Sequence, residues 1–239
     1  MTAAAPTTSA EDRRLALAVG AAAVVVVLWN VPLLGIALFP LRLLTTFAHE
    51  AGHGLTAILT GGHFLRFEIS GDGSGQALTA GGWRWLILPA GYVGSALFGV
   101  GLFVATQRAR RPTTVALAAA LGIGATALLF GTRSGLALVA GLGAAAALGV
   151  LSRLHERDGV VLVSLNVVAL VMAWNAVLDL LNILRAPSIG RGVILNDAAA
   201  FGAHVGVGGG RLWAFVWLLV VLAILAVGAR LALAPRTST

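Results

Sequence analysis

The chain has 239 residues, of which 59% are hydrophobic and only 10% are charged. Soluble globular domains carry about 25% charged residues, so this composition excludes an ordinary soluble protein and predicts an all-α polytopic membrane protein. The net charge of +7 comes entirely from arginine scattered between apolar runs, which argues against a nucleic-acid-binding surface, and the lack of cysteine excludes disulfides and thiolate metal sites.

About seven apolar segments fill the chain between a polar tail at 1–14 and a short tail at 236–239. Each is about 20 residues long, the length that spans the hydrocarbon core of a bilayer. The transmembrane helices are expected at about 15–39, 41–60, 83–106, 114–130, 135–151, 160–184 and 212–233. We therefore predict a single integral membrane domain over residues 15–235, embedded in the cell membrane as a multi-pass protein.

The second span carries the motif "HEAGH", with His49, Glu50 and His53 inside an apolar segment. Residues four apart share one face of a helix, so the two imidazoles can bind one metal ion. Glu50 can then reach a metal-bound water, as the general base of zinc-assisted hydrolysis does. Mid-membrane carboxylates cost roughly 2.5–3.5 kcal/mol on insertion scales, a cost that a bound cation offsets. The pattern predicts Zn²⁺ held by His49 and His53 with Glu50 as general base; a chance match or a buried hydrogen-bonded cluster is the alternative.

Residues 63–80, directly after this span, change character. Phe64, Arg66 and Glu68 alternate along the segment, and a "GDGSG" turn follows. Alternation of this kind indicates strands, so a short β-hairpin or re-entrant loop is predicted at the membrane surface, after the metal-binding helix.

A catalytic zinc site needs a third protein ligand and an open position. We expect Asp179, because it is the only ionisable residue within the span at 160–184 and a metal would offset the cost of burying it. Asp197 is the alternative ligand, although Asn196 and Asp197 before an alanine run resemble a helix N-cap. Three other histidines fit less well by their positions in loops: His63, His155 and His204.

The stretch "FAHEAGHGLTAILTGG", the hairpin, "LPAGYVGSALFG" and an Asn-x-x-x-Asp segment together resemble the site-2 protease family of intramembrane zinc metalloproteases. The similarity is to its compact bacterial branch without a PDZ domain, and it covers roughly residues 41–211. The resemblance implies that an aspartate on a later membrane helix completes the metal site and that Asn175 binds substrate backbone. The later motif departs from the family pattern, because "NAVLDLL" lacks the usual proline and glycine. An interhelical hydrogen bond is the alternative role for Asn175.

The resemblance also implies hydrolysis of peptide bonds in or near the transmembrane segments of membrane-anchored protein substrates. The hairpin would then bind the unwound segment by β-addition, or else serve as a plain connecting loop. Two other functions remain open from the residues alone: a zinc-binding scaffold without catalysis, and a permease for metal ions or small solutes.

Overall fold

The structure, a computed structural model, describes residues 39–185, 189–190, 193–194 and 196–233, with a few helical positions between 16 and 27. Most of the first expected span lies outside the described residues. The elements in chain order are α3 (Phe39–Leu59), β1 (His63–Ile69), β2 (Gly75–Ala80), α4 (Arg84–Ile87), α5 (Ala90–Arg108), α6 (Pro112–Phe130), α7 (Gly135–Leu151), the 3₁₀ turn η1 (His155–Arg157), α8 (Asp158–Arg185), β3 (Ile189–Gly190), β4 (Val193–Ile194), α9 (Asp197–Val205) and α10 (Gly210–Leu233).

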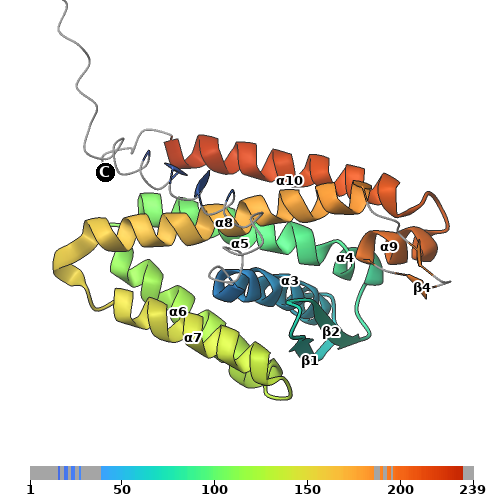
Figure 1. The fold of residues 1–239 in the computed structure, drawn as a ribbon, viewed down its shortest axis with the longest axis horizontal. Helices are drawn as coiled ribbons and strands as arrows, with labels where there is room; N and C mark the ends of the chain where they lie inside the picture. The colour runs from blue at the N-terminus through green and yellow to red at the C-terminus, as the bar shows by residue number, and fades with distance from the viewer. Residues whose placement is uncertain are drawn as a thin grey trace, which may run out of the picture.

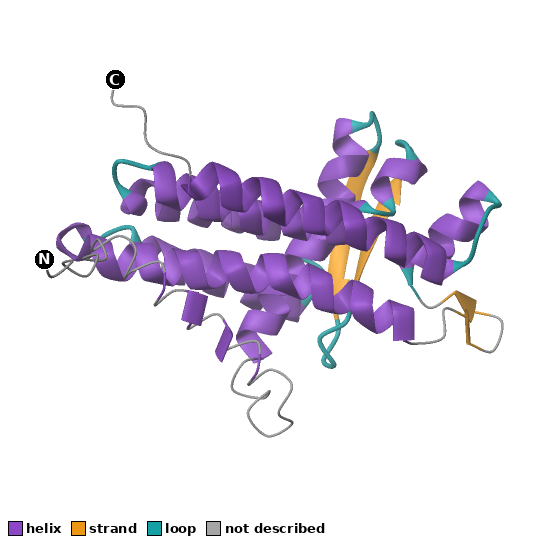
Figure 2. Cartoon of the chain, turned by 90° about the horizontal axis from the view of Figure 1, so that it is seen from above, coloured by secondary structure: helices purple, strands orange, loops and turns teal. Residues whose placement is uncertain are grey.

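Helix α3 lies at the centre of the helical bundle. Helices α5, α8 and α10 pack together on one side of it, and the α6–α7 pair packs on the other, while the hairpin, α4 and α9 gather near one end of the long helices (Figure 1). A view from above shows the long helices running side by side along one axis (Figure 2). One buried cluster joins α3 and the hairpin to α5–α8, and a second joins α5 and α8 to α9 and α10.

Helices α5 and α8 pack extensively against each other, and small residues allow their backbones to approach closely. A Cβ at Gly99 on α5 would lie 2.6 Å from the carbonyl oxygen of Ala169 on α8 and 2.9 Å from the Cβ of Ala173. Contacts of this kind drive helix association in lipid, where apolar burial supplies little. The Ala- and Gly-rich sequence is therefore used to bring backbones together.

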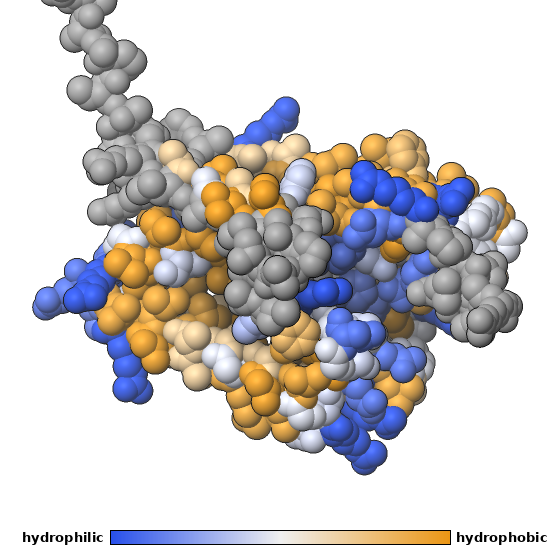
Figure 3. Space-filling view, viewed as in Figure 1, coloured by the Kyte–Doolittle hydropathy of each residue, from blue (hydrophilic) through white to orange (hydrophobic). Residues whose placement is uncertain are grey.

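Four helices in the described residues are long and apolar enough to cross a membrane: α5, α6, α8 with η1, and α10. Helix α7 is apolar but has only 17 residues, and α3 does not meet the same criteria of length and apolarity. Hydrophobic side chains cover much of the flank of the molecule, whereas hydrophilic ones gather toward its ends and around a hollow on the right (Figure 3). This arrangement confirms the all-α membrane fold; the expected total of seven spans is not reached by the described helices.

The span expected at 83–106 is divided in two. Helix α4 ends at Ile87, and α5 begins at Ala90 after Pro89. Proline has no backbone N–H and is well suited to the start of a helix, so the break falls where the sequence places it. The break brings the carbonyl of Ile87 to face α3, where it lies 2.6 Å from Nδ1 of His53.

The hairpin predicted at 63–80 is confirmed. β1 and β2 pair antiparallel, from His63 opposite Ala80 to Ile69 opposite Gly75, with an irregularity between Phe64 and Arg66. Its tip is tied to α3, because the hydroxyl of Thr46 donates to the carbonyl of Gly73 over 2.7 Å.

Phe67 anchors the hairpin to the bundle. Its side chain is fully buried, and its ring meets that of Phe47 edge-on at a centroid distance of 4.9 Å. Replacement by alanine should cost about 3–5 kcal/mol, the usual cost of emptying a buried aromatic site. We expect Phe67→Ala to lower the thermal unfolding midpoint in detergent and to expose the hairpin to limited proteolysis.

Leu65 provides the matched control, because it lies on the other face of the same strand and is 52% exposed. Leu65→Ala should leave both readouts close to those of the unmodified chain. Equal effects of the two substitutions would contradict the role of Phe67 as an anchor.

Candidate metal centre

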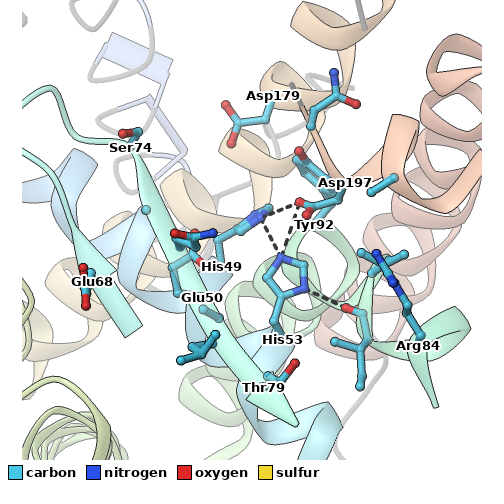
Figure 4. Close-up of a pocket in the computed structure, with 18 of the residues that line it drawn as sticks. His49, Glu50, His53, Glu68, Ser74, Thr79, Arg84, Tyr92, Asp179 and Asp197 are labelled. Atoms are coloured by element: carbon cyan, nitrogen blue, oxygen red, sulfur yellow. Dashed lines mark hydrogen bonds and ion pairs between the residues drawn. The ribbon is translucent and has the colours of Figure 1, made fainter. Parts of the chain in front are cut away.

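Two histidines on α3 begin the site. His49 and His53 lie one helical turn apart, and their Nε2 atoms are 3.1 Å from each other. His53 is buried, and the ring of His49 packs edge-on against that of Tyr92 at 4.5 Å. Packing on both rings fixes their orientation, so the two nitrogens point to one place in the pocket (Figure 4).

Asp197 approaches this place from α9. Its Oδ2 lies 3.2 Å from Nε2 of His49 and 3.4 Å from Nε2 of His53. Among the described residues, His49, His53 and Asp197 form the group of histidine and acidic side chains whose ligand atoms converge closely enough for one metal ion. Three ligand atoms from two distant parts of the chain therefore meet at one point.

The position of Asp197 follows from how α9 begins. Asn196 is the N-cap residue, and its side-chain oxygen accepts a hydrogen bond from the backbone N–H of Ala199 at 2.9 Å. Because Asn196 does the capping, the carboxylate of Asp197 in the first turn is free to face α3. The helix N-cap that the sequence indicates at Asn196 and Asp197 is therefore present, but Asn196 is the capping residue and Asp197 is not.

The three side chains fit a zinc ion. Ligand atoms about 2.0–2.1 Å from a tetrahedral ion lie about 3.3 Å from one another, and the three separations observed here are 3.1, 3.2 and 3.4 Å. The Nδ1–H of His53 donates to the carbonyl of Ile87 at 2.6 Å, which leaves the lone pair on Nε2 for the metal. Burial alone raises the pKa of the Asp197 carboxyl, but the hydrogen bonds and charges of the two imidazoles outweigh it and hold this pKa below its usual range.

Gly91 on α5 provides the space that the centre needs. A Cβ at this position would collide with Nε2 of His49 and lie 2.6 Å from Nε2 of His53. Every residue other than glycine would thus put an atom against the two ligand nitrogens.

Glu50 lies beside the ligands, between α3 and β2. It is buried, and its carboxylate accepts a hydrogen bond from the backbone N–H of Ala77. Gly75 passes so close that a Cβ there would lie 2.7 Å from Oε1 of Glu50. The hairpin therefore holds the Glu50 carboxylate in place through its backbone, and it places no positively charged side chain against that carboxylate.

Asp179 and Asn175 have a different arrangement from the one expected. Asp179 lines the same pocket from α8, but it is not in the converging group, and its Oδ2 accepts a hydrogen bond from Nδ2 of Asn175 at 2.7 Å. Asn175 thus bonds within its own helix, one turn away, and does not line the pocket. The geometry favours Asp197, the alternative ligand, over Asp179. The sequence argument favoured Asp179 because a carboxylate within a membrane helix needs a partner. It could not include the position of α9 relative to α3, which depends on the tertiary fold.

The remaining histidines stay apart from the centre. His63, His155 and His204 are exposed and lie outside the converging group. Sequence reasoning also assigned no role to Gly91 or Tyr92, which both contact the ligand rings. The signal was present in "LPAGYVGSALFG", which holds the only tyrosine of the chain next to a glycine.

The centre opens into a pocket of about 1020 Å³. Its walls come from α3, both strands of the hairpin, α4, α5, α8 and α9, and include polar side chains and the strand edge of the hairpin. Such a pocket provides space for water and for an extended peptide beside the ligands. Two histidines, an aspartate and an adjacent glutamate beside a pocket form the kind of arrangement found in metal-dependent hydrolases.

Comparison with known families agrees with this class. Residues 17–228 match the family described as Peptidase M50B-like. The chain belongs to this family, which makes it a membrane metalloprotease. Searches among curated proteins and among solved structures found no match.

Replacing each aspartate by asparagine in a separate variant tests which of the two binds the metal. We expect Asp197→Asn to lower bound zinc from about one ion per chain to well below half, because one of three protein ligands loses its charge. Asp179→Asn should keep its zinc, since this side chain is not in the converging group. Metal analysis of the purified proteins after dialysis measures both. Loss of zinc in Asp179→Asn alone would restore the assignment first expected from the sequence.

Gly91 gives an independent test of the same centre. We expect Gly91→Ala to lower zinc occupancy, because the new methyl group would displace the two imidazoles. Gly101→Ala on the same helix is the control, since a Cβ at Gly101 meets nothing within 4 Å. Zinc content and the far-ultraviolet circular dichroism of both variants should be compared; normal zinc in Gly91→Ala would show that the rings are not fixed as described.

Proposed function

We propose that the protein is an intramembrane zinc metalloprotease that hydrolyses peptide bonds in or near the transmembrane segments of membrane-anchored proteins, as in regulated intramembrane proteolysis. The observation that supports it most is the convergence of His49, His53 and Asp197 beside Glu50 in a pocket lined by a strand edge. A hydrolytic centre with this surrounding has room for a peptide in extended form.

Within the site, His49, His53 and Asp197 would hold the zinc ion. Bound in such a site, zinc polarises a carbonyl group and makes water acidic enough to deprotonate near neutral pH. Glu50 accepts the proton as the water attacks the scissile carbonyl, then passes it to the leaving amine. The backbone N–H of Ala77 orients the Glu50 carboxylate for this exchange.

The strand β2 is suited to bind the substrate. The N–H of Ala77 points toward Glu50 and hence away from β1, and in the described residues the sheet has only these two strands. Residues along β2 line the pocket. A transmembrane helix hides its amide bonds in its own hydrogen bonds, so it must be unwound before cleavage, and a free strand edge stabilises the unwound form by β-addition.

Glu50→Gln tests the proposal. The substitution keeps the shape of the side chain and the ligand set but removes the base, so zinc should stay bound while proteolysis falls about 10²–10⁴-fold. The assay reconstitutes the purified protein in liposomes with a panel of single-span membrane proteins and follows cleavage by gel and mass spectrometry.

Two alternatives have distinct outcomes in the same preparation. Cleavage that survives in Glu50→Gln would contradict the assigned base. Metal flux into the liposomes without any proteolysis would indicate a permease, and zinc binding with neither activity would indicate a scaffold.

A further inference from the structure

Arg84 is a charged residue of the pocket that the hydrolytic mechanism does not use. It opens the short helix α4 and lines the same pocket as the metal-binding histidines (Figure 4). Among the described residues it makes no ion pair within 4.0 Å. An arginine stays charged at every physiological pH, so its guanidinium group is available to an anion that enters the pocket.

The structure around Arg84 fixes its position. The backbone N–H of Trp83 donates to the hydroxyl of Thr60 on the turn after α3 at 3.0 Å. At the other end of α4, the carbonyl of Ile87 accepts the Nδ1–H of the metal ligand His53 at 2.6 Å. Arg84 thus belongs to a short element that is held at both ends, one end by the metal centre itself.

The two tryptophans beside Arg84 have a different environment. Trp83 and Trp85 stack on each other with 5.8 Å between ring centroids, and they are 57% and 51% exposed. Exposed tryptophans are typical of the membrane–water interface. Neither tryptophan lines the pocket, whereas Arg84 does. The arrangement assigns the lipid-facing role to the tryptophans and leaves the arginine for a ligand inside the pocket.

The charges of the pocket make this arginine distinctive. Its acidic lining residues are Glu50, Glu68, Asp179 and Asp197. Glu68 is paired with Arg66 at 2.8 Å, and Asp197 faces the two imidazoles. Arg84 is the only arginine among the described lining residues, so it is the one place in the pocket where a guanidinium group can receive a carboxylate.

The path of β2 relates Arg84 to the scissile bond. Ala77 lies beside Glu50, where the chemistry takes place, and the strand continues through Thr79 to Ala80 before the chain turns into α4. A strand advances about 3.3 Å per residue, so the pocket wall beyond Thr79 is two to four residues, roughly 7–13 Å, from the reacting atoms.

We propose that Arg84 is a specificity-determining residue that binds an acidic side chain of the substrate, two to four residues from the scissile bond. This inference rests on the proposed function, because it assumes a peptide along β2. It adds that the preferred substrates carry Asp or Glu on one defined side of the cleaved bond.

A binding assay that needs no cleavage tests the proposal. The protein carrying Glu50→Gln is held in detergent and titrated with dye-labelled 12-residue peptides of Ala, Val and Thr, followed by fluorescence anisotropy. Each peptide has an amidated C-terminus and a single Glu, moved through successive positions, and each has a partner with Gln in the same position. We expect Glu to strengthen binding about ten-fold over Gln at one or two adjacent positions.

Variants of Arg84 then identify the residue responsible. Adding Arg84→Gln should remove the preference for Glu, and adding Arg84→Glu should replace it by a preference for Lys at the same position. Arg211→Gln is the matched control, because Arg211 is exposed at the start of α10 and does not line the pocket. It should leave the preference unchanged.

Several results would overturn the proposal. These are peptides that bind no better with Glu than with Gln, and a preference that persists in Arg84→Gln. Tight binding of a Gln peptide once its C-terminal amide is replaced by a free carboxylate would also overturn it, by assigning Arg84 to a chain end. A preference abolished by adding phosphatidylglycerol to the micelles would overturn it by assigning Arg84 to a lipid headgroup. Zinc content and cleavage by the chain with Glu50 intact are measured separately, so failure here is distinguishable from failure of the proposed protease function.

Discussion

The whole arrangement depends on one constraint: polar groups placed within an apolar bundle must find partners inside the protein. His49, His53 and Asp197 solve this for each other by meeting within 3.4 Å. Three neighbouring helices must be arranged correctly for these side chains to converge. Helix α5 must pass without a side chain at Gly91, α4 must present the carbonyl of Ile87, and α9 must begin at Asn196.

The hairpin satisfies the same constraint for Glu50. A carboxylate beside two imidazoles in an apolar helix would be costly if it had no hydrogen-bond donor, and the N–H of Ala77 provides one. The donor comes from the free edge of a strand, which is also the part of the molecule suited to bind an extended peptide. Base and substrate are therefore expected to share one backbone edge, so the position of the strand governs both.

Sequence reasoning reached some parts of this structure and missed others for physical reasons. The membrane class, the hairpin and the shared face of His49 and His53 follow from composition and from periods of 2 and 3.6 residues, which are local properties. The choice between Asp179 and Asp197 is not local, because it depends on where a short helix lies relative to α3. The place of Arg84 in the pocket is equally non-local, because it depends on how α4 packs against α3.

The separation of the ligands along the chain bears on the biosynthesis of the protein. Asp197 follows His49 by 148 positions, and the helices α5, α6, α7 and α8 lie between them. A nascent chain that has inserted α3 thus carries two imidazoles and a glutamate without the carboxylate that completes the centre. If Asp197 completes the centre as proposed, hydrolytic competence arises only after α5, α6, α7 and α8 have been synthesised. Under the proposed function, an incomplete chain would therefore not cleave its neighbours in the membrane.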